Sequence, residues 1–277
     1  MARLSAFGDE AVDNFLGQVK FLAGEKVSFI EPRFLNKKNI LDLNKDELKE
    51  ARKILRDYGM KVSAIGSPIG KVRVDEPFGP HLDKFKHAVE LAFFFESPFV
   101  RVFSYYPPKG QDINKFRNQV IDRLAAQLEV IRDLDVVMVH ENETDIYGHS
   151  AENCVDLAKT LNSPKFKLVY DPANFVWGQK IKNNVEVCWP LMKPYVVHIH
   201  IKDWKLGADT GSMPGKGDGQ IKELLSELAA MKYEGCMTME PHLKVGGQFG
   251  GSTGTELFSK AIAAVRELSA QVGLECD

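Results

Sequence analysis

Four short sequences in the second half of the chain each run from apolar residues into a side chain that can bind a metal ion. They are VVMVHEN, FKLVYDPAN, YVVHIHIKD and CMTMEP, and their metal-binding side chains are Glu141, Asp171, His200 and Glu240. Successive members are 30, 29 and 40 residues apart, about the length of one strand and one helix. Parallel strands arranged around one axis bring such ends together. The spacing therefore predicts a divalent-metal site at the carboxyl end of a (β/α)8 barrel.

Three carboxylates and one imidazole make a mixed oxygen and nitrogen site. Such a set suits Mn²⁺, Mg²⁺, Co²⁺ or Zn²⁺, and the oxygen majority favours Mn²⁺ or Mg²⁺. Without a cation, three carboxylates inside a barrel mouth repel one another and are costly to bury. The alternative is that each acid pairs with a lysine or arginine, such as Lys202 or Arg101.

Strand-like and helix-like segments alternate from end to end of the chain, as the elements that must position these residues. We expect strands at residues 3–7, 27–31, 61–65, 99–103, 136–140, 166–170, 195–200 and 236–239, which are apolar and β-branched like parallel strands buried on both faces. Among the helices, one begins after Asn44 and ends at Gly59, one spans 114–134, and one spans 256–272 before Gly273. Eight such units predict an α/β fold, a (β/α)8 TIM barrel forming a single domain over residues 1–277. An open doubly wound sheet is the alternative, but no GxGxxG follows the first strand.

Composition excludes several classes of partner. The chain has 277 residues, a net charge of -2 and a pI of about 6.4, so no basic field predicts a nucleic acid or an anionic membrane as partner. The N-terminus lacks the apolar segment of a signal peptide, and no apolar run is long enough to span a membrane. The four cysteines are dispersed without a CxxC pair, which is typical of reduced thiols. Together these features predict a cytoplasmic protein.

Five motifs give the chain a resemblance to a known family. They are Glu141-Asn142, Asp171-Pro172 with Asn174, the segment from His198 to Asp203, the glycine-rich segment from Gly215 to Ile221, and Gly235 with Glu240. In these motifs the chain resembles the xylose isomerase-like TIM barrels, a family of sugar phosphate isomerases and epimerases that also includes inosose dehydratases and endonuclease IV. Two positions depart from the pattern: Asn174 stands where ketose epimerases usually have histidine, and Glu143 stands where many relatives have histidine.

The resemblance implies roles for the metal-binding residues. It makes His200, and not His198, the ligand from the seventh strand. It also implies that Glu141 and Glu240 transfer protons through a metal-stabilised enediolate, as the first and last ligand carboxylates do in the family's epimerases. Lys202 and His242 are alternative bases.

Substrate contacts are expected from residues at the ends of other strands. We predict Arg33, Asn174, Lys202, His242 and Trp204 as substrate-binding residues. Arg33 suits a carboxylate, a phosphate or a pair of hydroxyls, although it is equally suited to pairing with Glu31 or neighbouring ions. Other candidates are Lys71, Lys216 as a phosphate contact, and an apolar wall of Phe7, Tyr105, Tyr106, Trp177 and Trp204.

These residues predict a metal-dependent isomerase or epimerase that acts on a sugar, a keto-sugar or an inositol derivative. The alternative is a dehydratase or lyase that acts on a keto-sugar or 3-keto-glycoside with the same metal site. Phosphodiester hydrolysis would need further histidine and aspartate ligands, and a non-catalytic sugar-binding protein would not need all four predicted ligands. The expected partner is a small-molecule sugar. Homo-oligomers are compatible with the sequence, because many such barrels form dimers or tetramers, but no apolar stripe specifies one.

Overall fold

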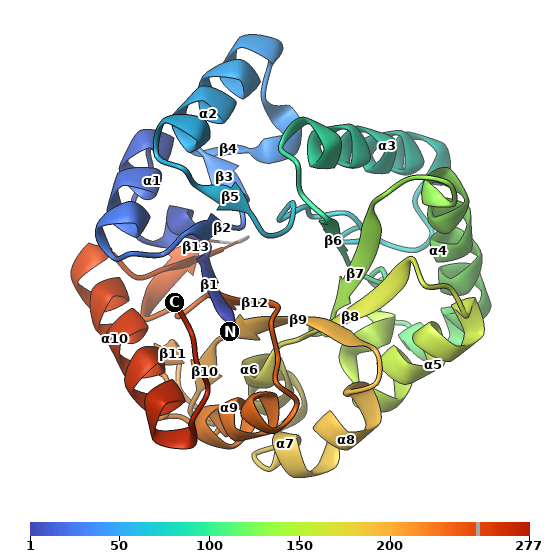
Figure 1. The fold of residues 1–277 in the computed structure, drawn as a ribbon. Coiled ribbons are helices and arrows are strands. Elements are labelled where there is room, and N and C mark those ends of the chain that lie inside the picture. Colours follow the sequence, from blue (N-terminus) through green and yellow to red (C-terminus); the bar gives the residue numbers. More distant parts are fainter. Residues whose placement is uncertain (248–249) are drawn as a thin grey trace.

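The computed structural model, which describes residues 1–247 and 250–277, is a ring of parallel strands surrounded by helices (Figure 1). Six strands form one parallel sheet in the order β1-β12-β9-β8-β7-β6, and β2 pairs in parallel with β5. Their bounds are β1 (Arg3–Ala6), β2 (Phe29–Ile30), β5 (Lys61–Val62), β6 (Phe99–Val102), β7 (Val137–Glu141), β8 (Phe166–Tyr170), β9 (Val196–Ile201) and β12 (Cys236–Met239).

Backbone hydrogen bonds join the β2–β5 pair to the larger sheet on both sides. The Glu31 N–H donates to the Ala6 carbonyl over 2.9 Å, which connects β2 with β1. The Arg101 N–H donates to the Ile65 carbonyl over 3.1 Å, which connects the segment after β5 with β6. These contacts complete the ring, and the predicted (β/α)8 barrel is confirmed.

The helices lie outside the strands and cover the barrel (Figure 1). They are α1 (Phe15–Gly24), α2 (Lys45–Asp57), α3 (Phe78–Phe94), α4 (Arg117–Ile131), α5 (Ala151–Leu161), α6 (Pro172–Gln179), α7 (Asn184–Val187), α8 (Trp189–Met192), α9 (Ile221–Ala230) and α10 (Thr255–Val272). Three short antiparallel pairs decorate the loops: β3 (Phe34–Leu35) with β4 (Lys38–Asn39), β10 (Asp203–Trp204) with β11 (Gly211–Ser212), and β13 (Lys244–Gly247) with β14 (Gly250–Ser252).

Local signals in the sequence account for several helix ends. Asn44 and Glu47 form a capping box at the start of α2, and Gly59 follows that helix with a φ of +62°. Gly273 ends α10 with a φ of +74°, as expected for a glycine that ends a helix. The predicted helix 114–134 is shorter than expected, because a 3-10 turn (Ile113–Phe116) precedes α4.

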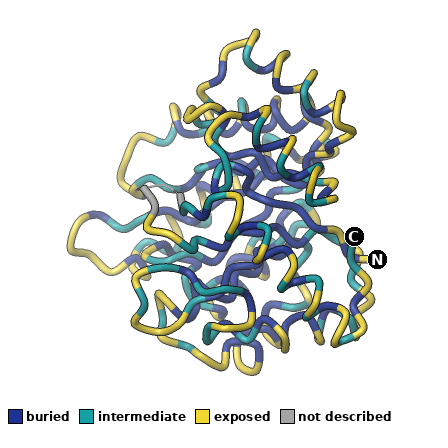
Figure 2. Tube along the Cα trace, turned by 90° about the vertical axis from the view of Figure 1, so that its left-hand side faces the viewer, coloured by how far each residue is buried: buried dark blue, intermediate teal, exposed yellow. Residues whose placement is uncertain are grey.

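The strands pack their apolar side chains into a core that fills the barrel and the layer beneath the helices. Buried residues follow the strands through the centre of the molecule, while exposed residues lie on the outer helices and loops (Figure 2). Among the described residues, no helix is both long and apolar enough to cross a membrane. Polar residues are buried mainly where the strands end, and these form the candidate site.

Candidate active site

The four predicted metal ligands lie in or directly after four neighbouring strands, and their side chains are close together. Glu141 ends β7, Asp171 follows β8 as the N-cap of α6, His200 lies in β9, and Glu240 follows β12. All four side chains are buried, and one ligand atom from each lies within 4.8 Å of the others. His200 Nδ1 is 3.2 Å from Glu141 Oε1 and 3.7 Å from Glu240 Oε2. We refer to these four residues as the ligand cluster.

The donor atoms of the ligand cluster fit a divalent cation. Both ring nitrogens of His200 are buried without a well-formed hydrogen bond, although carboxylate oxygens lie 3.2 and 3.4 Å away. Buried polar atoms are almost always hydrogen-bonded, so the poor geometry at His200 fits a site that a cation would complete. Three carboxylates with one imidazole are a donor set for Mg²⁺ or Mn²⁺, and also admit Co²⁺ or Zn²⁺.

Lys202 and Arg101 are among the cations that compensate the ligand cluster. Lys202 Nζ lies 2.8 Å from Asp171 Oδ2 and 3.4 Å from Glu240 Oε2. Arg101 Nη1 lies 3.0 Å from Glu141 Oε2. The ion pairing that the sequence offered as an alternative is therefore present together with the cluster, and the two arrangements do not exclude one another.

The charges of the ligand cluster shift one another's pKa values. Burial opposes ionisation of Glu141, but His200 and Arg101 outweigh it and lower the Glu141 pKa to about 2. Burial raises the pKa of Asp171 to about 6, although Lys202 opposes the rise. Burial opposes protonation of His200, yet Glu141 and other carboxylates outweigh it and raise the His200 pKa to about 10. The imidazole thus holds a proton that a metal ion would displace.

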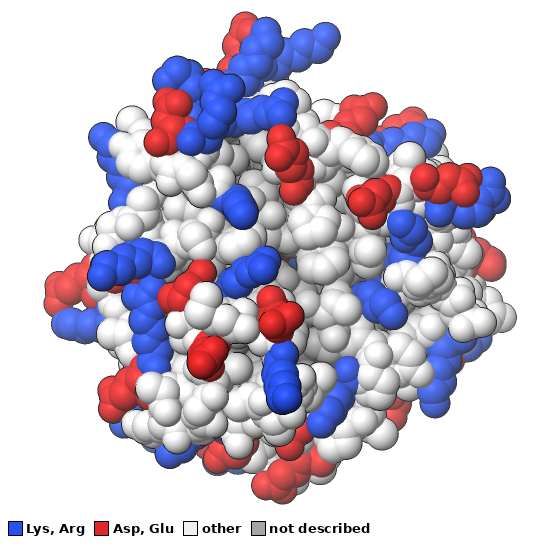
Figure 3. Space-filling model, viewed as in Figure 1, with Lys and Arg blue, Asp and Glu red and all other residues white. Residues whose placement is uncertain are grey.

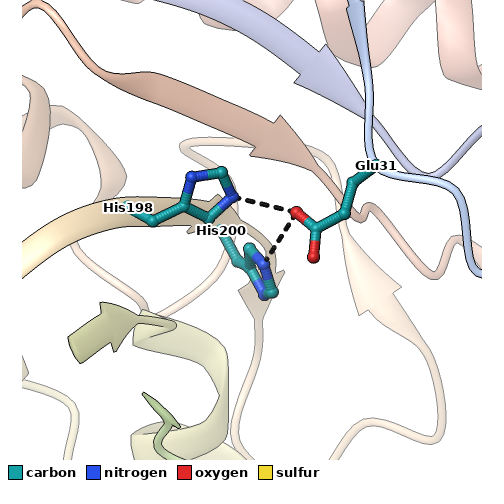
Figure 4. A group of neighbouring side chains, drawn as sticks. All are labelled: Glu31, His198 and His200. Carbon is teal, nitrogen blue, oxygen red and sulfur yellow. Dashed lines mark hydrogen bonds and ion pairs between the residues drawn. The ribbon is translucent and has the colours of Figure 1, made fainter. Parts of the chain in front are cut away.

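A buried carboxylate, Glu31, fixes the far side of His200. Glu31 Oε2 lies 2.9 Å from His198 Nε2 and 3.4 Å from His200 Nε2, and it accepts a hydrogen bond from Thr238 Oγ1 over 3.0 Å. Figure 4 shows the two histidine side chains of β9 and the carboxylate that both face. Because Nε2 of His200 faces Glu31, Nδ1 faces the ligand cluster, and a partner of this kind orients a ligating histidine. The pairing of His198 with Glu31 was not predicted.

Arg33 lies at the edge of the ligand cluster. Its Nη1 donates to Glu240 Oε1 over 2.8 Å, and its Nη2 donates to Asp9 Oδ2 over 2.9 Å. The guanidinium also lies over the ring of Phe7, 4.4 Å from its centroid. Arg33 therefore pairs with neighbouring ions, as one of the two interpretations of the sequence held, but not with Glu31. Asp9 was not singled out, and its only signal was its place after the first strand.

His242 also contacts the ligand carboxylate of Glu240. Its Nε2 lies 3.2 Å from Glu240 Oε1 and 3.1 Å from Glu10 Oε1, and its backbone N–H donates to Glu10 Oε2 over 2.9 Å. Burial opposes protonation of the ring, but Glu10 and Glu240 outweigh it and raise the His242 pKa to about 9. The residue has a φ of +50°, a backbone conformation that non-glycine residues adopt rarely and often at functional sites.

A cavity of about 1080 Å³ opens above the ligand cluster. Its walls include all five predicted substrate-binding residues, and its floor includes two of the ligand carboxylates. The lining residues from these sets are Arg33, Asn174, Lys202, His242, Trp204, Glu141 and Glu240. Figure 3 shows the opposite face of the barrel, on the side of the chain termini, where lysines, arginines and acids are interspersed. The geometry is that of a deep site for a small polar molecule.

Other candidates from the sequence divide into those that line the cavity and those that do not. Lys71 lines it and pairs with Glu143 over 2.8 Å, and Trp177 lines it beside Trp204. Tyr105 and Phe7 are fully buried in the packing below. Lys216 is exposed and lies outside the cavity lining.

The glycine-rich loop that contains Lys216 has its backbone donors occupied. The N–H groups of Gly215, Gly217 and Gly219 all donate to the carboxylate of Asp203, over 2.8 to 2.9 Å. Because Asp203 takes these donors, the loop acts as a structural anchor. It does not present a free cradle for a phosphate.

With the fold and the site described, the relationship to known proteins can be stated. The sequence model of the family described as xylose isomerase-like TIM barrel matches residues 20–268. The chain belongs to this family. No curated protein sequence matches the chain. The family match confirms the resemblance that the motifs predicted.

Solved structures of the same fold include epimerases, a dehydratase and a metal complex. D-psicose 3-epimerase with D-tagatose, from Clostridium cellulolyticum H10, is 14% identical with a TM-score of 0.75, covering 99% of this chain and 100% of that one. A xylose isomerase-like TIM barrel protein from Mycobacterium smegmatis in complex with magnesium is 16% identical with a TM-score of 0.76, covering 98% and 97%. The probable 3-DHS dehydratase AsbF from Bacillus anthracis is 13% identical with a TM-score of 0.76, covering 96% and 99%. At these identities the likeness shows the fold alone.

Proposed function

We propose that this protein is a divalent-metal-dependent isomerase or epimerase that acts on a sugar, a keto-sugar or an inositol derivative. The observation that carries the proposal is the placement of Glu141 and Glu240 around His200. In each carboxylate, one oxygen faces the His200 ring and the other is held by an arginine at the cavity. Glu141, Asp171, His200 and Glu240 would hold the ion, with Mg²⁺ or Mn²⁺ favoured by the oxygen majority.

When bound, the cation would polarise a carbonyl and the neighbouring hydroxyl of the substrate, which acidifies the adjacent C–H. The chain's own carboxylates then move the proton. Glu141 or Glu240 removes it with the oxygen that faces away from His200. The proton is returned either by the same carboxylate, which is now protonated, or by the other carboxylate after it has taken a proton from solvent. Return to the same carbon gives epimerisation, whereas return to the neighbouring carbon gives isomerisation.

The remaining residues of the cavity would bind and orient the substrate. Arg33 and Lys202 place donors beside Glu240, where they keep its pKa low and can also bind substrate oxygens. Asn174 reaches Glu141 Oε1 at 3.4 Å from α6 and lines the cavity. Trp204 offers an apolar surface and His242 a charged donor. We assign substrate binding to these five side chains.

His242 supports a second candidate, the dehydratase or lyase that acts on a keto-sugar or 3-keto-glycoside. It lines the cavity, and its Nε2 lies 3.2 Å from Glu240 Oε1 and 3.1 Å from Glu10 Oε1, so a protonated His242 is placed to donate into the cavity. Once a carboxylate has removed the proton beside the carbonyl, a leaving group on the next carbon can depart with the proton from His242. Elimination thus needs one more acid than epimerisation, and the cavity contains one.

The four free cysteines support a proposed cytoplasmic location, because thiols stay reduced there. A small-molecule sugar as partner, with no nucleic acid or membrane, belongs to the same proposal. Homo-oligomerisation stays a prediction, which the molecular mass in solution would decide.

Solvent deuterium incorporation tests the proposed function. The protein is loaded with Mg²⁺ or Mn²⁺ and incubated in D₂O with ketoses, inososes and 3-keto-glucosides, and the products are followed by NMR and mass spectrometry. Deuterium at one carbon of a product with unchanged composition supports isomerisation or epimerisation. Release of water or of an aglycone decides for elimination. Absence of both across the panel would contradict the proposal.

A further inference from the structure

Helix α6 connects the ligand cluster with the mouth of the cavity. Asp171 is its N-cap and accepts hydrogen bonds from the Ala173 and Asn174 N–H groups, over 2.9 and 3.2 Å. Asn174 and Trp177 lie three residues apart, and both line the cavity. With a rise of about 1.5 Å per residue, the backbone of Trp177 is about 9 Å along the helix from that of Asp171. Helix α6 therefore runs from the ligand cluster towards the mouth of the cavity.

On the face of α6 that lines the cavity, exposure rises from Asp171 to Trp177. Asp171 is 0% exposed, Asn174 is 7% exposed, and Trp177 is 51% exposed. The residues between them on the helix, Phe175 and Val176, are fully buried and supply its packing to the barrel. The Trp177 ring therefore contributes little to the core, and it presents a large apolar surface to the cavity mouth, where such a surface marks a binding site.

A second indole completes this surface from another strand. Trp204 lies two residues after Lys202, and its ring centroid is 6.4 Å from that of Trp177 at an interplanar angle of 70°. The Trp204 indole N–H donates to the Ala208 carbonyl over 3.1 Å, which holds the ring in place. The two rings form an apolar corner on one side of the cavity, and we call this pair the tryptophan corner.

We propose that the tryptophan corner is a subsite for a ring attached to the sugar, so that the substrate is a keto-glycoside and not a free sugar. The inference rests on the proposed function, since it takes the reacting sugar to lie at the ligand cluster. The backbone of Trp177 lies about 9 Å along α6 from that of the ligand Asp171, and Trp177 lines the same cavity as Glu141 and Glu240. The cavity of about 1080 Å³ also exceeds what one sugar needs, since pockets of roughly 300–1,000 Å³ hold drug-sized molecules. An aromatic aglycone or a second sugar ring has a flat apolar face that fits the corner.

Binding of three glucosides to the Mg²⁺-loaded protein tests the subsite without requiring turnover. The probes are methyl β-D-glucoside, phenyl β-D-glucoside and cellobiose, and affinity is measured by titration calorimetry. We expect the wild type to bind at least one ring-bearing probe about five- to tenfold more tightly than methyl glucoside, which is the worth of one aromatic contact. The probe that gains affinity distinguishes an aromatic aglycone from a second sugar.

Substitution then assigns the gain to the corner. Trp177→Ala should abolish the preference for the ring-bearing probe and leave methyl glucoside binding unchanged, whereas Trp177→Phe should keep most of the preference. Phe93→Ala is the matched control, because Phe93 is 48% exposed on α3 and lies outside the cavity lining. Equal affinity for all three probes in the wild type, or a preference that survives in Trp177→Ala, would overturn the proposal.

The subsite and the proposed function can each be contradicted without the other. Deuterium exchange into a free ketose with no ring preference would support the isomerase and contradict the subsite. A ring preference that depends on Trp177, with no exchange and no elimination on any substrate, would support the subsite and contradict the isomerase.

Discussion

The two sides of the cavity floor are built differently. The ligand cluster lies at the ends of β7, β8, β9 and β12, which are regular parallel strands of four to six residues. The arginine side, which we define by Arg33 and Arg101, has mixed support: Arg101 lies in the regular strand β6, whereas β2 contains two residues and Arg33 lies in the loop after it. Arg33 and Arg101 nevertheless reach Glu240 and Glu141 at 2.8 and 3.0 Å. The comparison teaches that the strands position the acids, while the arginines hold them ionised.

Removing a ligand carboxylate should have the largest effect. Glu240→Gln or Glu141→Gln keeps the shape of the side chain but loses the charge that binds the cation and accepts the proton. We expect the rate of solvent deuterium exchange to fall by about 10³-fold or more, and metal binding to be lost with it. The rate is measured by NMR on the substrate that the panel identifies.

Glu143→Gln is the control for this pair. Glu143 lies two residues after Glu141 and lines the same cavity, but it pairs with Lys71 and is outside the ligand cluster. This variant should keep its metal. If Glu143→Gln lost the metal and Glu240→Gln kept it, the ligand cluster would be assigned wrongly.

The next largest effect should come from the arginine side. Arg101→Met leaves Glu141 and Glu31 buried without this cation, which lies 3.0 and 3.9 Å from them. Breaking a buried ion pair in this way costs about 3–5 kcal/mol of the free energy of unfolding. Urea denaturation measures the loss, and added Mg²⁺ should restore more stability in Arg101→Met than in the wild type.

An exposed pair supplies the comparison for Arg101. Arg117 and Asp156 are bound at 2.6 Å, but both side chains are about one third exposed. Arg117→Met should cost about 1 kcal/mol or less. An equal cost for the two variants would show that the buried position of Arg101 has no special importance.

A smaller, pH-dependent effect on the free energy of unfolding is expected from His81, which also lines the cavity. His81 Nε2 accepts a hydrogen bond from the Gly70 N–H over 2.9 Å, and burial with nearby Arg123 lowers the His81 pKa to about 4. A pKa that is lower in the folded state means that the unfolded chain binds the proton more readily. Stability from this group is therefore fully present above pH 6.5 and is lost as the pH falls towards 4.

His81→Gln isolates this contribution, because glutamine keeps an acceptor for Gly70 but does not titrate. Between pH 7.5 and 5 the wild type should lose about 2 kcal/mol more of the free energy of unfolding than the variant does. Denaturant titrations at several pH values measure the difference. Parallel pH profiles for the two proteins would contradict the assignment.

The smallest effect concerns Lys202, which pairs with two carboxylates of the ligand cluster. Lys202 Nζ lies 2.8 Å from Asp171 Oδ2, so its charge opposes a divalent cation at the same oxygens. Lys202→Met should bind Mn²⁺ about tenfold more tightly in a calorimetric titration. Weaker binding in the variant would mean that Lys202 supports the cation site.

The same contrast explains what could be predicted from the sequence. The ligand cluster was readable because each ligand ends an apolar strand at a regular spacing, and the family motifs distinguished His200 from His198. Glu31 pairs with both histidines, and Glu10 pairs with His242, although each pair is separated by more than a hundred positions in the sequence. Asp9 pairs with Arg33, which lies in the irregular loop after β2. No local pattern marks such pairs, because they depend on how the barrel closes. Closure itself was predictable from the eight alternating units, whereas the short β2 and β5 were expected to be longer.

Metal stoichiometry tests the central claim most directly, namely that Glu141, Asp171, His200 and Glu240 hold one divalent cation. Mn²⁺ is titrated into the metal-free protein and free Mn²⁺ is counted by electron paramagnetic resonance. The account predicts one Mn²⁺ per chain in the wild type and none in Glu240→Gln. A wild type that binds no Mn²⁺, or a Glu240→Gln variant that binds it as tightly, would mean that Lys202, Arg101 and Arg33 alone neutralise these acids.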